Sequence, residues 1–215
     1  MKTAFQREQS EAVASTPGRR ERKRRETGER IFHAAMQLFA ERGFFNTTVE
    51  DITEAADVAK GTFFNYFPSK EHVLGVLHDV QLAKVKEVRE AAQAGKLPLR
   101  DLLRKFMQRI AEEPGRSQLL ARGLLATVFS SEPVREMLVE TMTYGRRMLT
   151  DVLKLGQQRG EIRRDLSAED MTRSFQQCVL GTLLIWSLNR PASLNKQLDI
   201  AFEIFWSGIS ARTAA

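Results

Sequence analysis

The sequence predicts an all-α protein built from two helical parts. Apolar residues recur at spacings of three and four along most of the chain, which is the period of an amphipathic helix. No segment of any length alternates apolar and polar residues as a half-buried strand would. Three short helical segments near the N-terminus precede several longer ones. A small N-terminal domain and a larger C-terminal domain are therefore expected.

The composition is that of a folded protein with a basic surface. The chain has 215 residues, of which 42% are hydrophobic and 28% charged, so it can bury a substantial core. Its formal net charge is +6. An excess of positive charge favours a polyanionic partner, which is either nucleic acid or an anionic membrane surface. The charge alone does not distinguish these two partners.

Signals for export or membrane insertion are not recognisable in the sequence. Residues 1–18 contain no apolar signal segment, and the longest apolar run, 178–188, is about half of the roughly 20 residues that a membrane span requires. Cys178 is the only cysteine, which excludes an internal disulfide and fits a reducing compartment. We expect a cytoplasmic protein without a membrane partner.

Residues that could carry chemistry do not cluster into a recognisable site. His33, His72 and His78 are the only histidines, and no group of carboxylates completes a metal site with them. A nucleophile motif and a glycine-rich phosphate loop are also absent from the sequence. We therefore predict no catalytic residue, no metal and no cofactor.

The first 25 residues are predicted to form a disordered basic arm. Residues 1–18 are mostly polar and small, and the run of arginine and lysine over 19–25 is broken only by Glu21. Two interpretations are open. Such a run is either a solvated tail, or an arm that reaches phosphates or the minor groove beside a DNA-binding unit.

Three short helices are predicted in the next segment, residues 26–70. The first begins near Thr27 and ends at Gly43, because glycine favours the left-handed conformation that closes a helix. The second begins after the N-cap Thr48 and stops near Asp57. The third covers residues 60–67 and is terminated by Pro68. With a short turn between the second and third helices, this pattern predicts a helix-turn-helix.

The remainder, residues 71–215, is expected to be helical throughout. The predicted helices are 70–92 with Ser69 as its cap, 99–110, 119–129, 133–158, 167–188 and one from 193 onward. The helix over 119–129 is apolar almost all round, so we expect it to lie centrally.

Two stretches of the N-terminal segment, TTVEDI at 47–52 and VAKGTFFNYFPSKE at 58–71, carry a family pattern. Over residues 28–73 the chain resembles the DNA-binding domain of the tetracycline-repressor (TetR) family of bacterial regulators. The resemblance implies an N-terminal helix-turn-helix DNA-binding domain and a C-terminal helical domain for effector binding and dimerisation. It further implies a ligand-responsive regulator, usually a repressor and not an enzyme. Such a protein binds a palindromic operator in double-stranded DNA as a homodimer and is released by a small-molecule effector.

The resemblance assigns DNA contacts to eight residues, which are Thr48, Lys60, Gly61, Thr62, Phe64, Asn65, Tyr66 and Lys70. Thr48 would meet a phosphate at a helix N-terminus. In the third helix, Thr62 and Asn65 would bond base edges, and Gly61 would allow close approach to the groove. Lys60, Tyr66 and Lys70 would hold phosphates, which position the protein without reading sequence.

Three residues depart from the usual pattern of the family. Phe64 stands where a tyrosine is common, so a phosphate hydrogen bond is lost and an apolar contact remains. Ala59 replaces a capping serine or threonine, at a cost of roughly 1 kcal/mol. Asp57 replaces a glycine in the turn, and aspartate tolerates the left-handed conformation better than most residues.

The C-terminal domain offers candidates for effector binding and dimerisation. Polar or aromatic residues that interrupt apolar faces are candidates for the effector pocket, and they are Arg122, Thr141, Tyr144, Gln177, Thr182 and Trp186. The alternative interpretation is that each of the six is an ordinary core residue or an exposed residue. The resemblance implies a homodimer formed by the last two helices. The last helix carries more apolar residues than one contact requires, namely Phe202, Ile204, Phe205, Trp206 and Ile209.

Two other classes of protein remain as alternatives. One is a basic protein that coats DNA without sequence preference through residues 19–25. The other is a helical enzyme with a basic surface, for which the sequence shows no catalytic constellation.

Overall fold

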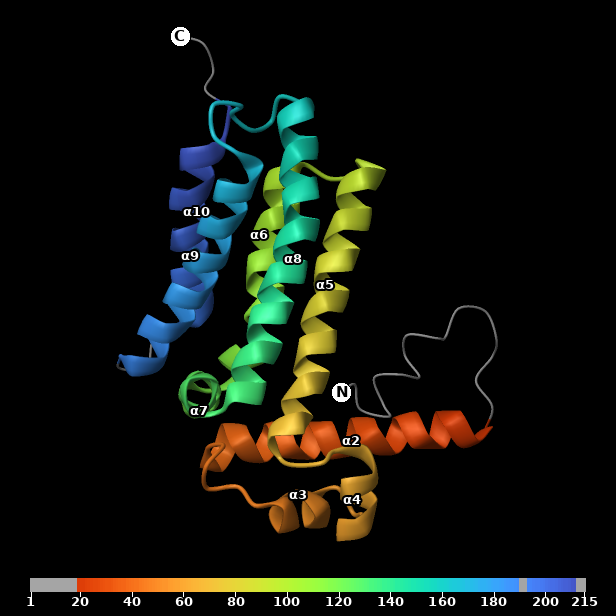
Figure 1. Ribbon diagram of the computed structural model, residues 1–215. Coiled ribbons are helices and arrows are strands. Elements are labelled where there is room, and N and C mark those ends of the chain that lie inside the picture. The colour runs from red at the N-terminus through yellow and green to blue at the C-terminus, as the bar shows by residue number, and fades with distance from the viewer. Residues whose placement is uncertain (1–18, 190–192, 212–215) are drawn as a thin grey trace. The chain divides into compact units, whose positions relative to one another are not determined.

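The computed structural model describes residues 19–189 and 193–211, and within them every named element is a helix (Figure 1). The predicted all-α class, a helix-turn-helix followed by a helical domain, is thereby confirmed. The chain divides into two compact units between Val76 and Leu77. The expected boundary lay slightly earlier, after residue 70.

The described part of the first unit contains the three predicted helices, of which α2 is long, and a 3-10 turn. They are α2 (Arg19–Arg42), α3 (Val49–Ala55), α4 (Lys60–Tyr66) and η1 (Glu71–Val73). Phe39, Ile52, Phe63 and Phe67 are almost fully buried and form the core of this unit. The rings of Phe63 and Phe67 lie 5.7 Å apart, so the two side chains also pack against each other in this core.

The N-terminal end of α2 corrects the expected arm. The helix begins at Arg19, so the basic run over 19–25 is helical where the sequence pattern predicted disorder. Two pairs at helical spacing, Arg22 with Glu26 and Arg25 with Glu29, place opposite charges one turn apart and support this turn. The rest of the expected arm, residues 1–18, lies outside the described residues.

Local capping signals set the ends of these helices. Gly43 follows α2 with a φ of 85°, and Asp57 follows α3 with a φ of 51°. Both residues therefore adopt the left-handed conformation that their residue types tolerate. Thr48 caps α3 and receives a hydrogen bond from the Asp51 amide, as its type and position predicted.

The second unit contains the remaining helices of the described chain. They are α5 (Leu74–Ala94), whose first turn still belongs to the first unit, α6 (Leu99–Ile110), α7 (Gln118–Ser130), α8 (Glu132–Gln158), α9 (Ala168–Leu188) and α10 (Leu194–Ile209). A 3-10 turn, η2 (Pro114–Arg116), joins α6 to α7. The core of this unit is mainly aliphatic and includes an aromatic cluster, in which Phe175 packs against both Phe106 and Phe205.

The start of α5 differs from the prediction. A helix capped by Ser69 was expected from residue 70, but the 3-10 turn η1 comes first and the α-helix begins at Leu74. The Ser69 hydroxyl contacts the side chains of Glu71 and His72. It therefore holds the two side chains of the turn and does not cap a longer helix.

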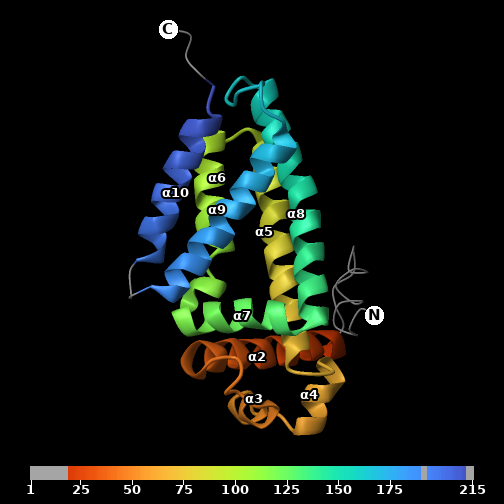
Figure 2. The same ribbon diagram turned by 60° about the vertical axis from the view of Figure 1, so that its left-hand side comes forward.

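The helix α7 is not central, contrary to its expected place. Figure 2 shows it running across one end of the bundle made by the other helices of the second unit. Leu120 and Ala121 are buried, whereas Phe129 is 79% exposed. The helix therefore buries part of its apolar surface and exposes Leu119 and Phe129, although its sequence is apolar almost all round.

Candidate nucleic-acid interface and ligand cavity

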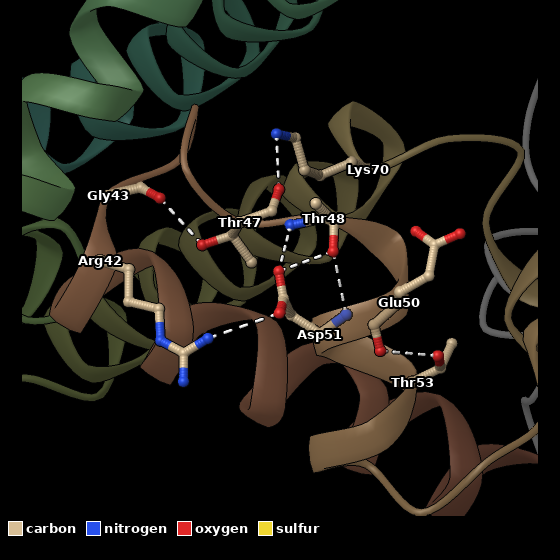
Figure 3. Close-up of polar contacts among 8 residues, drawn as sticks. All are labelled: Arg42, Gly43, Thr47, Thr48, Glu50, Asp51, Thr53 and Lys70. Carbon is tan, nitrogen blue, oxygen red and sulfur yellow. Dashed lines mark hydrogen bonds and ion pairs between the residues drawn. The ribbon is translucent and has the colours of Figure 1, made fainter.

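The loop between α2 and α3 is tied together by its two threonines (Figure 3). The hydroxyl of the buried Thr47 donates to the carbonyl of Gly43 at 2.9 Å. Thr48 and Asp51 form a capping box, in which the Thr48 amide donates to the Asp51 carboxylate at 2.7 Å and the Thr48 hydroxyl accepts from the Asp51 amide at 3.1 Å. The hydrogen bonds from Thr48 lower the pKa of the Asp51 carboxyl.

Lys70 lies against this loop from the other side of the helix-turn-helix. Its ammonium donates to the carbonyls of Phe44 at 2.7 Å and Thr47 at 2.9 Å, and it sits 4.3 Å from the centre of the Phe44 ring. Burial lowers the pKa of this ammonium. An ammonium has three donors, so one is left for a phosphate. Sequence reasoning missed this structural role, because nothing local links residue 70 to residues 44 and 47.

One face of α4 is open to solvent, and the other anchors the helix. Lys60, Gly61, Phe64 and Asn65 are exposed, whereas Phe63 between them is fully buried. The two remaining residues assigned to this helix, Thr62 and Tyr66, are half-buried. The structure therefore brings the predicted reading residues together on α4.

Three residues of the exposed face bear on contact with a nucleic acid. A Cβ built on Gly61 would meet no described atom within 4 Å, so nothing inside this chain requires a glycine there. Phe64 is 47% exposed, which is unusual for so large an apolar ring. Lys60 forms an ion pair with Glu50 of α3, and the hydrogen bond from Lys60 lowers the pKa of the Glu50 carboxyl.

The second unit contains an apolar cavity of about 180 Å³, walled by α5, α6, α8 and α9. Its polar lining residues are Gln81, Thr141 and Gln176. One of the six residues predicted for an effector pocket, Thr141, lines this cavity.

The other five predicted pocket residues lie elsewhere. Tyr144 and Gln177 are exposed, and Thr182 is half-buried outside the lining. Arg122 donates to the backbone carbonyl of Ser187 at 2.9 Å, and the buried Trp186 accepts from Gln118 through its own carbonyl.

Sequence reasoning missed Gln81 and Gln176, although a signal existed for the second. The lining residues Val179 and Leu183 of α9 are four apart, and counting seven back from Leu183 reaches Gln176 rather than Gln177. For Gln81 no signal was visible, because its surroundings come from a different helix.

The last two helices expose apolar side chains, but mostly different ones from those predicted. Phe202, Phe205 and Ile209 are buried, and Trp206 stacks on Phe202, so these residues belong to the core of the chain itself. Of the five residues expected to contribute to a dimer interface, Ile204 is exposed, with 68% of its surface accessible. The other large apolar side chains that are exposed on α9 and α10 are Leu180, Leu184, Ile185, Leu188 and Ile200.

The described residues form neither a metal site nor a membrane-spanning helix. Among residues 19–189 and 193–211, no group of three histidine, cysteine or carboxylate side chains is arranged to hold a metal ion. In the same part of the chain, no helix combines the length and the apolar character needed to cross a bilayer.

Both units match known protein families. Residues 31–77 match the family of bacterial regulatory proteins called tetR, and residues 78–208 match the C-terminal domain of TetR/AcrR family transcriptional repressors. The chain belongs to the TetR family. Members of this family regulate transcription and are not enzymes, which excludes the alternative of a helical enzyme.

This TetR-family regulator is similar to named regulators over much of its length. It is 28% identical over 181 residues to the HTH-type transcriptional repressor DhaR of Mycobacterium sp. (strain GP1), covering 81% of this chain and 90% of the relative. It is 41% identical over 81 residues to the HTH-type transcriptional regulator TcmR of Streptomyces glaucescens, covering 36% of this chain and 35% of that protein.

Solved structures share the fold of the regulator. FadR of Thermus thermophilus, a TetR-family transcriptional repressor solved in complex with lauroyl-CoA, is 30% identical with a TM-score of 0.61, covering 87% of this chain and 97% of that one. FadR of Bacillus halodurans has a TM-score of 0.70 at 19% identity, covering 92% of this chain and 100% of that one.

Proposed function

We propose that this TetR-family regulator is a ligand-responsive repressor. It binds a palindromic DNA operator as a homodimer in the cytoplasm and is released when a small molecule occupies the cavity of its second unit. The observation that carries the proposal is the exposed face of α4, where Gly61, Phe64 and Asn65 lie together while Phe63 anchors the helix in the core.

This face has the chemistry that a major groove requires. Asn65 and Thr62 offer hydrogen bonds to base edges, and a short residue at Gly61 lets the backbone approach the bases. Phe64 offers an apolar contact that fits a thymine methyl group. Lys60 and Tyr66 supply groups for phosphates, which set position rather than sequence preference.

The homodimer is proposed from the surface of α9 and α10. The exposed leucines and isoleucines of these two helices are apolar side chains without cover from their own chain, and Ile185, Leu188 and Ile204 are each more than half exposed. Two copies related by a twofold axis would bury the same patch against itself. Such a dimer carries two copies of α4, which suits a palindromic operator.

Release by an effector is proposed from the cavity. A ligand that binds one arrangement of the two units better than another shifts the population toward it, and DNA affinity changes accordingly. Two relatives support the type of function: DhaR is named a repressor, and FadR of Thermus thermophilus is a repressor solved with a small molecule bound.

The DNA-binding part is tested by selecting bound sequences from random duplex DNA. We expect the full-length chain to enrich a palindrome, and Asn65→Ala to lose discrimination at one base pair per half-site by about tenfold, or roughly 1–3 kcal/mol for a base-specific contact. Asn195→Ala, a matched change at an exposed position of α10, should leave the selected sequence unchanged. Enrichment of no sequence would favour a protein that coats DNA, and an unchanged preference in Asn65→Ala would show that another surface reads the bases.

A further inference from the structure

Gln81 has an acceptor without a partner in the wall of the cavity. Its Nε2 donates to the backbone carbonyl of Ile110 at 3.0 Å, at the C-terminal end of α6. Its Oε1 is buried and has no hydrogen-bond partner among the described residues. Exchanging the two amide atoms would place Oε1 against the Ile110 carbonyl oxygen, so the orientation of the amide is determined by that bond. An unpaired buried acceptor is costly and calls for a donor.

The other polar groups of the wall are already engaged. Gln176 accepts from the Arg146 Nε at 3.0 Å and donates to the Met142 carbonyl at 2.8 Å. Thr141 donates its only proton to the Met137 carbonyl at 2.7 Å and also contacts His78. Gln81 Oε1 is therefore the buried side-chain acceptor of the wall that still lacks a hydrogen bond, and a donor on a bound molecule that reaches it would supply one.

The cavity is unsuited to a charged molecule. Its described lining consists of apolar side chains, one glycine, two glutamines and a threonine, with no acidic or basic residue. The buried Lys84, one turn from Gln81 on α5, is paired with Glu113 and contacts the Arg109 carbonyl, so its charge is already compensated. A ligand charge in this lining would lose its hydration without gaining a counter-charge.

The volume indicates the size of the apolar group that the cavity can enclose. Apolar cavities of about 150 Å³ bind a benzene molecule. A cavity of about 180 Å³ therefore accepts one ring with a small substituent, two fused rings, or an aliphatic molecule of similar volume.

We propose that the effector is a neutral, largely apolar molecule of one or two rings, or of that size, whose hydroxyl or N–H group donates to Gln81 Oε1. This inference rests on the proposed function, in which the cavity is the effector site. The class differs from lauroyl-CoA, the ligand of the Thermus thermophilus relative, because a coenzyme A thioester carries several phosphate charges.

The test compares pairs of probe molecules. The two members of a pair have similar shapes, but only one of them carries a hydrogen-bond donor. Titration calorimetry on the full-length chain would use 4-methylphenol against 4-fluorotoluene and indole against benzothiophene, with lauroyl-CoA as the anionic probe. We expect each donor to bind at least about tenfold more tightly than its counterpart, because the counterpart leaves Gln81 Oε1 unpaired. In Gln81→Leu this preference should disappear.

A second variant covers the case in which Gln81→Leu fails to fold. Gly145 lines the cavity, and a Cβ there would meet the Val85 side chain at 3.7 Å, an ordinary contact. Gly145→Ala should therefore fold, whereas Gly145→Leu extends into the cavity and should abolish binding of both donors. Equal binding within both pairs, tighter binding of lauroyl-CoA, donor binding that survives in Gly145→Leu, or no binding by any probe would each overturn the proposal.

The experiments give different results if the proposed ligand class is wrong and if the proposed regulatory function is wrong. A chain that enriches a palindrome yet shows no donor preference has the proposed function with another ligand class. If instead the donors bind with the expected preference but leave DNA affinity unchanged, the ligand class stands and the regulatory role of the cavity is wrong.

Discussion

Lys70 joins two ends of the helix-turn-helix that are distant in sequence. Its ammonium holds the carbonyls of Phe44 and Thr47, so it positions the loop from which α3 starts. A lysine at this place contributes to the shape of the DNA-binding unit before it meets any phosphate. Its effects on stability and on DNA binding therefore have to be measured separately.

We expect Lys70→Met to lower the free energy of unfolding of the regulator by about 1–3 kcal/mol, because two charge-assisted hydrogen bonds are lost. Lys60→Met should change stability little, since the Lys60 side chain is 57% exposed and its ion pair with Glu50 lies at the surface. Urea unfolding followed by circular dichroism measures both. A Lys70→Met protein as stable as the unaltered chain would show that these bonds contribute nothing.

A substitution at Gly61 should change the stability of the chain and its affinity for DNA in opposite directions. Alanine is favoured over glycine within a helix by about 0.5–1 kcal/mol, and the added methyl group meets no described atom of the chain. Gly61→Ala should therefore raise the melting temperature while lowering operator affinity by about tenfold, if the α4 backbone approaches the bases closely. Fluorescence anisotropy with an operator duplex provides the second measurement. Undiminished affinity would place this part of α4 away from the DNA.

At the scale of elements, α2 carries most of its basic residues in its first two turns. Arg22 and Arg25 pair with glutamates one turn further on, and Arg20 and Lys23 are exposed beside them. Because this run is helical rather than disordered, its charges have fixed spacing along one element. A helix of this kind can hold phosphates at defined positions, whereas a loose tail would bind them anywhere.

The double variant Arg20→Gln, Lys23→Gln should reduce the salt dependence of DNA binding. Each lost phosphate contact lowers the slope of log affinity against log salt concentration by about 1, so a decrease of up to about 2 is expected. Lys105→Gln with Lys196→Gln makes the same change of charge at exposed positions of the second unit and should leave the slope unaltered. Equal slopes for the two double variants would exclude a specific role of α2 in phosphate binding.

At the scale of the whole molecule, the exposed apolar face of α9 and α10 determines the proposed assembly. It contains two glycines as well, Gly181 and Gly208, at which a Cβ would meet no described atom within 4 Å. Small residues on such a face allow two helices to approach each other closely. A dimer built there would deliver two reading helices to one operator and gain affinity through that linkage.

We expect Ile185→Glu combined with Ile204→Glu to yield monomers, because each carboxylate would be buried without a partner in the dimer. Sedimentation velocity at micromolar concentration gives the oligomeric state, and operator affinity should fall with it by about 10²-fold or more. Phe129→Glu removes a still more exposed apolar residue on α7 and serves as the control, which should stay dimeric. A double variant that remains a dimer would place the interface elsewhere.

Features that depend on near neighbours could be predicted from the residues alone. The helical period, the capping residue Thr48, the left-handed Gly43 and Asp57, and the inward Phe63 all follow from interactions within a few residues. The family pattern over 47–71 adds the assignment of α4 as the helix that reads DNA, which stays a prediction. These features were predictable because propensity, capping and side-chain phase are local properties of the chain.

Contacts between distant residues depend on how the helices pack and could not be predicted from the sequence. Lys70 with Phe44 is one such contact, and Gln81 with Ile110 is another; each joins residues more than 20 positions apart. The same reason explains why most predicted pocket residues do not line the cavity and why Phe202 and Phe205 are core residues rather than surface ones. An apolar stripe shows that a helix face is buried, but which neighbour covers it depends on how the helices pack.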